Sequence, residues 1–241
     1  MKIYTTQITS ELRPLINSAT DVLSIDEERI INSINNQEVK KNTLVSKVLK
    51  RYFLSLHCDG KVSPADWSFK TSACQKPKLD HTSHDKPNLF FNVSHCEDVF
   101  AMAISSKDEV GLDIESYRFK IDDNLAQTVF TDSQIVKWQG TSTLSKQMHY
   151  LRLWTIKEAY AKYLGLGIGL DFIGIDVIGR SESYYAAFCN KVVQPNLIYN
   201  ETIYFSGKSY ALSVTHKGIN PNQNPHIIEF DSRSLMKLLS K

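Results

Sequence analysis

The first hundred residues alternate between patterns typical of strands and of helices. Residues 2–8 alternate apolar and polar side chains, which predicts a short strand. Helices are expected to open at Ser10, with Pro14 in the first turn, and near Ser24, where acidic residues favour the positive end of the helix dipole. A third helix is predicted over 38–56, because apolar residues recur there at helical spacing.

After a loop-rich stretch, the order of strand, helices and strands starts again. The apolar runs predict strands at 89–93, 99–104 and 110–115, helices near 122–129, 132–139 and 143–164, and strands near 172–178, 184–190, 201–206 and 209–215. This repeated order predicts an α+β, sandwich-like fold of two similar halves in tandem. The halves are expected at 1–109 and 110–225, with 226–241 as a C-terminal tail that ends in a short peripheral helix.

Composition narrows the class of protein. The 241 residues include 42% hydrophobic and 22% charged side chains, as in an ordinary soluble globular protein, and the net charge of +2 gives no general reason to bind nucleic acid or a membrane. Neither a signal peptide nor a membrane span is visible. The four cysteines lack metal-ligand spacing and are expected to be reduced: Cys58, Cys74, Cys96 and Cys189. The cytoplasm is the expected compartment.

The first candidate for chemistry is the strand Gly111–Glu115. Residues two apart on a strand point to the same face, so Asp113 and Glu115 project together while Leu112 and Ile114 pack on the other side. Two neighbouring carboxylates repel each other unless a cation lies between them, and oxygen ligands without His or Cys favour magnesium over zinc. A solvated acidic turn is the alternative interpretation.

The second candidate is a stripe on the long helix. Trp154, Glu158 and Lys162 are each one turn apart, which places an acid and a base beside a large aromatic side chain. An exposed Glu–Lys pair is the alternative, but tryptophan usually seeks burial, so the stripe suits a cleft. The glycines Gly165, Gly167 and Gly169 follow directly, and they either end the helix or let backbone approach a ligand.

The third candidate is the strand end Phe91–Cys96. Ser94 and His95 are suited to hydrogen bonds with phosphate oxygens, while a structural histidine is the alternative. A Cys–His nucleophile pair is disfavoured, because adjacent residues on an extended chain point in opposite directions.

Taken together and in order, these segments resemble the Sfp-type 4′-phosphopantetheinyl transferases. The resemblance rests on Lys76-Pro77, on Asn92–His95, on Gly111–Glu115, and on Trp154–Ala159 with Lys162 and Gly165. It implies a fold of two halves related by pseudo-twofold symmetry, with coenzyme A bound between them. It also implies transfer of the phosphopantetheine arm of coenzyme A to a serine of an apo acyl or peptidyl carrier protein, with release of adenosine 3′,5′-bisphosphate.

The resemblance assigns roles by position. Asp113, Glu115 and Glu158 match the acidic residues that hold Mg²⁺, and Glu158 alternatively takes the serine proton. Lys162 matches the lysine on the pyrophosphate, and the remaining matches to coenzyme A contacts are Ser94, His95, Lys76 and Pro77. A docking place for an acidic carrier protein is expected at Tyr117, Arg118, Phe119 and Lys120, for which an ordinary basic loop is the alternative. Because the two halves supply a complete site, a monomer is expected.

The sequence departs from the family's pattern at a few positions. The family often has an arginine where this chain reads Lys40-Lys41-Asn42-Thr43, so Lys40 or Lys41 is the expected contact to the 3′-phosphate. Gln75 replaces a frequent glycine, and Gln134 stands where an acidic residue is common. The rival functions are an inactive module that binds coenzyme A or a carrier protein, and a magnesium-dependent phosphoesterase or nuclease. Gly174–Val177 resembles the Asp113 strand but lacks a second carboxylate, so it is expected to belong to the core.

Overall fold

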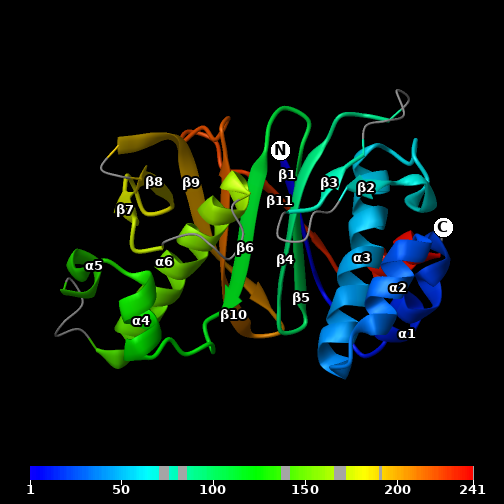
Figure 1. Ribbon diagram of the computed structural model, residues 1–241, viewed down its shortest axis with the longest axis horizontal. Helices are drawn as coiled ribbons and strands as arrows, with labels where there is room; N and C mark the ends of the chain where they lie inside the picture. Colours follow the sequence, from blue (N-terminus) through cyan, green and yellow to red (C-terminus); the bar gives the residue numbers. More distant parts are fainter. Residues whose placement is uncertain (71–75, 81–85, 137–141, 166–171, 190–191, 241) are drawn as a thin grey trace.

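The computed structural model describes residues 1–241 except 71–75, 81–85, 137–141, 166–171, 190–191 and 241. Predictions that fall on Cys74, Gln75, Gly167 and Gly169 therefore lie outside the described residues. Two sheets form the centre of the molecule, and the longest helices lie on opposite outer sides of them (Figure 1).

The N-terminal half contains a four-stranded sheet in the order β11-β1-β5-β4. The strand β1 pairs antiparallel with β5 and parallel with β11. Its strands are β1 (Lys2–Gln7), β4 (Phe90–Cys96), β5 (Val99–Ser105) and β11 (His226–Phe230). The helical elements of this half are α1 (Leu12–Ser18), η1 (Ala19–Val22), α2 (Ile25–Ser33), α3 (Gln37–His57) and η2 (Pro64–Asp66). Two short strands, β2 (Phe69–Lys70) and β3 (Lys78–Leu79), pair antiparallel.

The C-terminal half contains a five-stranded antiparallel sheet in the order β6-β10-β9-β8-β7. Its strands are β6 (Val110–Ser116), β7 (Ile175–Gly179), β8 (Tyr184–Cys189), β9 (Val192–Phe205) and β10 (Lys208–His216). Its helices are α4 (Asp123–Val129), α5 (Asp132–Val136) and α6 (Thr143–Leu164). In each half the first strand pairs with the second strand of a hairpin, β5 of β4–β5 and β10 of β9–β10, so the predicted repeat is visible in the topology.

Alternation along the strands builds the layers. On β5, Val99, Ala101 and Ala103 face a core shared with β6 and β10, while Phe100 and Met102 face the helices of the N-terminal half. The shared core lies between the two sheets, because β6 and β10 turn Leu112, Ile114, Leu212 and Val214 into it. The molecule is therefore a helix–sheet–sheet–helix sandwich, as the sequence predicts.

Local sequence signals define the helix ends. Ser24 forms a capping box with Glu27, since each side chain bonds the backbone of the other residue. Ser142 caps α6 by accepting the Ser145 amide hydrogen, and Gly165 ends that helix with a φ of 71°, in the left-handed region that glycine adopts without strain. Of the three glycines after α6, Gly165 thus ends the helix.

Two features at the C-terminal end differ from the sequence analysis. The strand β9 begins at Val192, well before the predicted start near residue 201, and β11 was not predicted. A helix, α7 (Ser232–Leu239), forms as predicted, but its peripheral position is wrong, because Leu235 is fully buried in the core of the N-terminal half. Two short strands, β2 and β3, also form inside the stretch expected to be loops.

Candidate active site

The candidate site begins on β6, whose two faces have opposite character. Leu112 and Ile114 are fully buried in the shared core, and Gly111 lies on the other face against α6. A Cβ at Gly111 would stand 1.9 Å from the Ala159 carbonyl oxygen and 2.5 Å from the Tyr163 amide nitrogen. The absence of a side chain at Gly111 therefore lets α6 approach β6 closely enough for Asp113 and Lys162 to meet.

Asp113, Lys162 and Ser94 form a compact polar group between β6, α6 and β4. The Lys162 Nζ atom lies 2.6 Å from Asp113 Oδ1 and donates to Ser94 Oγ at 3.1 Å. Ser94 in turn donates its hydroxyl hydrogen to Asp113 Oδ1 at 2.9 Å. Because Asp113 is buried and the Lys162 side chain is partly exposed, the ammonium closes the carboxylate off from solvent.

Glu115 and Glu158 complete the acidic set. Burial, then the Asp113 carboxylate and more weakly Glu158 raise the pKa of Glu115 to about 7. Burial and Asp113 also raise the pKa of Glu158. The negative charges of Asp113, Glu115 and Glu158 therefore repel one another between β6 and α6. The Lys162 ammonium carries one positive charge and does not neutralise all three carboxylates.

The described residues contain no group of three His, Cys, Asp or Glu side chains close enough together to hold a metal ion. Asp113 nevertheless keeps one buried oxygen, Oδ2, without a hydrogen-bond partner. An unpaired carboxylate oxygen beside two further carboxylates is a polar environment that a cation satisfies.

Side chains of β4 connect the two edge strands β4 and β6. Asn92 Oδ1 accepts the Leu112 amide hydrogen at 2.8 Å, Ser94 binds Asp113, and Cys96 binds Glu115 and the Ser116 amide. These three residues are two apart and therefore share one face of β4. The strand β4 is therefore linked to β6, the edge strand of the five-stranded sheet, by hydrogen bonds of its side chains instead of by backbone pairing.

His95 lies on the other face of β4, opposite Ser94. It is exposed and borders a pocket together with Arg13 of α1, Asn42 of α3 and the acidic turn Glu97-Asp98. His95 and Cys96 point in opposite directions, as expected when a Cys–His pair was disfavoured, whereas Ser94 and His95, expected together as phosphate contacts, also lie on opposite faces. The sequence analysis did not single out Arg13 or Asn42, because no local pattern relates them to a strand end more than fifty residues away.

Lys76 and Pro77 border a second pocket, with Leu79, Phe90 and Glu109. The Lys76 ammonium lies 2.6 Å from Glu109 Oε2 and donates to the Val110 carbonyl oxygen at 2.6 Å. Glu109 also pairs with Lys78 at 2.9 Å. Lys76 therefore connects the residues just before β3 to the start of β6. This connection was not predicted from the sequence.

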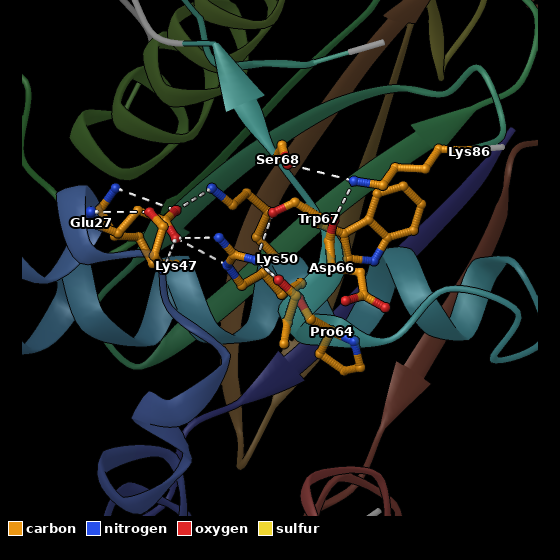
Figure 2. A network of polar contacts seen from close by, with 11 residues as sticks. Glu27, Lys47, Lys50, Pro64, Asp66, Trp67, Ser68 and Lys86 are labelled. Carbon is orange, nitrogen blue, oxygen red and sulfur yellow. Dashed lines mark hydrogen bonds and ion pairs between the residues drawn. The ribbon is translucent and has the colours of Figure 1, made fainter. Parts of the chain in front are cut away.

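A buried ion network binds the segment from Pro64 to Phe69, just before and at the start of β2, to α2 and α3 (Figure 2). Arg51 of α3 lies 2.6 Å from Glu27 of α2, and its Nη1 atom donates to the Pro64 and Trp67 carbonyl oxygens at 3.0 and 2.8 Å. Lys50 pairs with Glu27 at 3.1 Å and lies 3.4 Å from the centre of the Phe69 ring. The strand β2 begins at Phe69 and pairs with β3, which directly follows Lys76-Pro77. The contacts of the network therefore also help to fix the position of β3.

The remaining predicted residues lie at the start of α3 and directly after β6. Lys40 donates to Asn32 Oδ1 at 3.2 Å, and neither Lys40 nor Lys41 borders the His95 pocket. Directly after β6, the Tyr117 hydroxyl lies 3.1 Å from Thr202 Oγ1, and the next three residues are exposed: Arg118, Phe119 and Lys120. The structure thus brings together Asp113, Glu115, Glu158, Lys162 and Ser94, and His95 and Lys76 border two separate pockets.

Other residues of the quoted motifs have structural contacts. Lys157, next to Glu158, is fully buried and donates to the Val129 and Phe172 carbonyl oxygens at 2.6 and 2.8 Å. The Trp154 ring stacks on Phe172 with 5.9 Å between centroids. The expected core position of Gly174–Val177 holds for Ile175 but is wrong for Gly174, which is exposed; half-buried Asp176 accepts a hydrogen bond from Gln134 Nε2 at 3.0 Å. An acid in place of Gln134 would instead repel Asp176.

Two family models match this chain in succession. Residues 12–107 match the model described as 4′-phosphopantetheinyl transferase, N-terminal, and residues 109–215 match the 4′-phosphopantetheinyl transferase superfamily. A holo-[acyl-carrier-protein] synthase of Streptococcus agalactiae is 33% identical over 39% of this chain and 68% of its own length. The chain belongs to the 4′-phosphopantetheinyl transferase superfamily.

Further similarity extends along most of the chain. The 4′-phosphopantetheinyl transferase gsp of Aneurinibacillus migulanus is 23% identical over 77% of this chain and 73% of its own length. Among solved structures, a holo-(acyl-carrier-protein) synthase from Bacillus anthracis in complex with CoA (3′,5′-ADP) is 19% identical, with a TM-score of 0.35, over 44% of this chain and 93% of that chain. Within the described residues, no helix is both long and apolar enough to cross a membrane.

Proposed function

We propose that this chain transfers the 4′-phosphopantetheine group of coenzyme A to a serine of an apo acyl or peptidyl carrier protein. Membership of the superfamily supports the class of reaction. The observation that carries the proposal is the group formed by Asp113, Lys162 and Ser94, which lies where β4, β6 and α6 meet. His95 and Lys76 border two further pockets.

The reaction requires little covalent chemistry from the protein. The carrier serine oxygen attacks the phosphorus next to the pantetheine arm, the bond from that phosphorus to the bridging pyrophosphate oxygen breaks, and adenosine 3′,5′-bisphosphate leaves with the electron pair. Positioning and charge stabilisation dominate such transfers. Lys162 donates hydrogen bonds to the pyrophosphate, as a compact charge on a flexible stem. Ser94 orients that ammonium through its hydroxyl, and His95 and Lys76 contact the nucleotide portion.

The proposed cofactor is Mg²⁺, held by Asp113, Glu115 and Glu158. The unpaired Asp113 Oδ2 atom and the raised pKa of Glu115, about 7, support this assignment, because both indicate more buried negative charge than the protein itself neutralises. When bound, Mg²⁺ neutralises charge on the pyrophosphate.

Glu158 is also suited to accept the serine proton. Burial and Asp113 raise its pKa, which brings the carboxylate closer to the range in which a base works well at neutral pH. Ligand and base remain the two candidate roles, and both require the ionised carboxylate.

The carrier protein is proposed to dock beside the end of β6. Arg118 and Lys120 supply exposed positive charge next to Phe119, whose side chain is 42% exposed. Such a combination suits an acidic partner with an apolar contact. For Lys40 and Lys41, positions at the start of α3 that are half-buried and exposed respectively support contact with the 3′-phosphate. One chain supplies the whole proposed site, and the cytoplasm, where coenzyme A and carrier proteins meet, is the proposed compartment.

The test is intact-mass measurement of several apo carrier proteins after incubation with the purified chain, Mg²⁺ and coenzyme A. A gain of one phosphopantetheine group on at least one carrier is expected, and Glu158→Gln should abolish it while circular dichroism stays unchanged. Binding of coenzyme A without transfer to any carrier would instead identify an inactive binding module. Loss of phosphate from coenzyme A without a carrier would identify a hydrolase.

A further inference from the structure

Cys96, the last residue of β4, lies between two groups of β6. Its Sγ atom donates to Glu115 Oε2 at 3.1 Å and accepts the Ser116 amide hydrogen at 3.1 Å. The thiol thus uses one donor and one acceptor, the complete set that a cysteine offers. Cys96 is a free cysteine, so it forms no disulfide. Neither of its two contacts would activate the thiol as a nucleophile.

The contact with Glu115 has no substitute in the described part of the chain. Asp113 is bound by both Lys162 and Ser94, whereas the thiol of Cys96 is the one hydrogen-bond donor that reaches the Glu115 carboxylate among the described residues. A glutamate has one more rotatable side-chain bond than an aspartate, so a single fixed oxygen greatly restricts where its other oxygen points.

We infer that Cys96 is a positioning residue, which fixes one carboxylate oxygen of Glu115 and so restricts how the other approaches Mg²⁺. The inference rests on the proposed function, because it assigns a metal to the carboxylates of that site. Groups that hydrogen-bond a metal ligand orient it, and removing one typically weakens metal binding about 10- to 100-fold. The thiol donates to Oε2, and no side chain among the described residues donates a hydrogen bond to Oε1.

The alternative role for Cys96 is to fill space at the contact between the two edge strands. The two roles predict different results for serine, alanine and valine at this position. Serine keeps one donor and one acceptor, alanine removes both, and valine fills the volume without a donor. If Cys96 only packs, valine is the mildest of the three substitutions, whereas positioning makes serine the mildest.

The experiment measures Mn²⁺ binding by electron paramagnetic resonance, with coenzyme A present and no carrier protein. Cys96→Ala and Cys96→Val are expected to weaken Mn²⁺ binding by about 10-fold or more, and Cys96→Ser by no more than about 2-fold. The matched control is Cys58→Ala, which removes a second free cysteine of the described residues, located directly after α3, and should bind Mn²⁺ like wild type. The Mg²⁺ concentration for half-maximal transfer should rise by the same factor in the alanine and valine variants.

Thermal unfolding of each variant separates lost positioning from lost folding, because only folded variants enter the comparison. If Cys96→Ala or Cys96→Val folds and binds Mn²⁺ as tightly as wild type, the inference is refuted while the proposed function stands. Equal weakening in serine, alanine and valine variants also refutes it, since serine retains the hydrogen bonds. A wild-type protein that neither binds Mn²⁺ nor transfers phosphopantetheine refutes both.

Discussion

Gly111→Ala tests the close contact between β6 and α6. The new Cβ would stand 1.9 Å from the Ala159 carbonyl oxygen, 2.5 Å from the Tyr163 amide nitrogen and 2.8 Å from Tyr163 Cβ. Ordinary contacts between heavy atoms need about 3.5 Å, so α6 must move away from β6 by roughly 1 Å or more. Two of the three obstructing atoms belong to the helix backbone and cannot rotate aside. Overpacking of this kind costs about 1–3 kcal/mol of stability, and more where backbone must shift.

The same displacement moves Glu158 and Lys162 relative to Asp113. A misplacement of about 1 Å lowers a catalytic rate roughly 100-fold. The assay is the initial rate of carrier-protein modification at saturating coenzyme A and Mg²⁺, with stability measured by denaturant unfolding of the same preparation. Gly179→Ala in β7 is the matched control, because its Cβ would meet nothing closer than 3.7 Å, so it should leave both quantities nearly unchanged. Transfer by Gly111→Ala at the wild-type rate, with unchanged stability, would refute the reasoning.

Two further predictions concern the N-terminal half. Burial alone would raise the pKa of Glu27, but Lys50 and Arg51 outweigh it and lower the pKa from 4.5 to about 2. Because the folded pKa is lowered, the ionised Glu27 stabilises the protein above pH 4.5, and this stabilisation is lost as the pH falls toward 2. In urea unfolding, Glu27→Gln should therefore be about 3 kcal/mol less stable than wild type at pH 7, and this difference should shrink below pH 4.5. A difference in stability that does not change with pH would contradict the assignment. Leu235→Ala should lower the free energy of unfolding by about 2–5 kcal/mol, because Leu235 is fully buried. The control Leu144→Ala, at a side chain that is 72% exposed, should change it by less than about 0.5 kcal/mol. Equal effects of the two substitutions in thermal unfolding would count against the docking of α7.

Much of the fold follows from local pattern. The alternation of Gly111–Glu115 correctly predicts that Leu112 and Ile114 enter a core while Asp113 faces α6. The helical spacing of Glu158 and Lys162 likewise predicts that they approach one site from α6. Such features are accessible from sequence because the geometry of a single strand or helix fixes them.

The remainder depends on contacts between distant segments. Nothing near Lys76 in the sequence indicates that Glu109 pairs with it, and nothing near Arg13 indicates that it meets His95 at a pocket. The strand β11 escaped prediction because its residues are only partly buried, so that periodicity is weak: it is an edge strand that pairs with one neighbour. Cys96 was interpreted as a reduced thiol without further role, since a hydrogen bond across two strands leaves no trace in the local sequence.

The pairing of β11 with β1 has a consequence for synthesis on the ribosome. Thr6 donates to the carbonyl oxygen of Phe230 across 224 positions of the chain, so the partner of the first strand is translated long after it. Until then one edge of β1 stays open and Leu235 is missing from the core beneath it. The half translated first is therefore completed last. Its open strand edge could pair with another chain in the meantime, so this is where a chaperone would most need to shield the nascent chain.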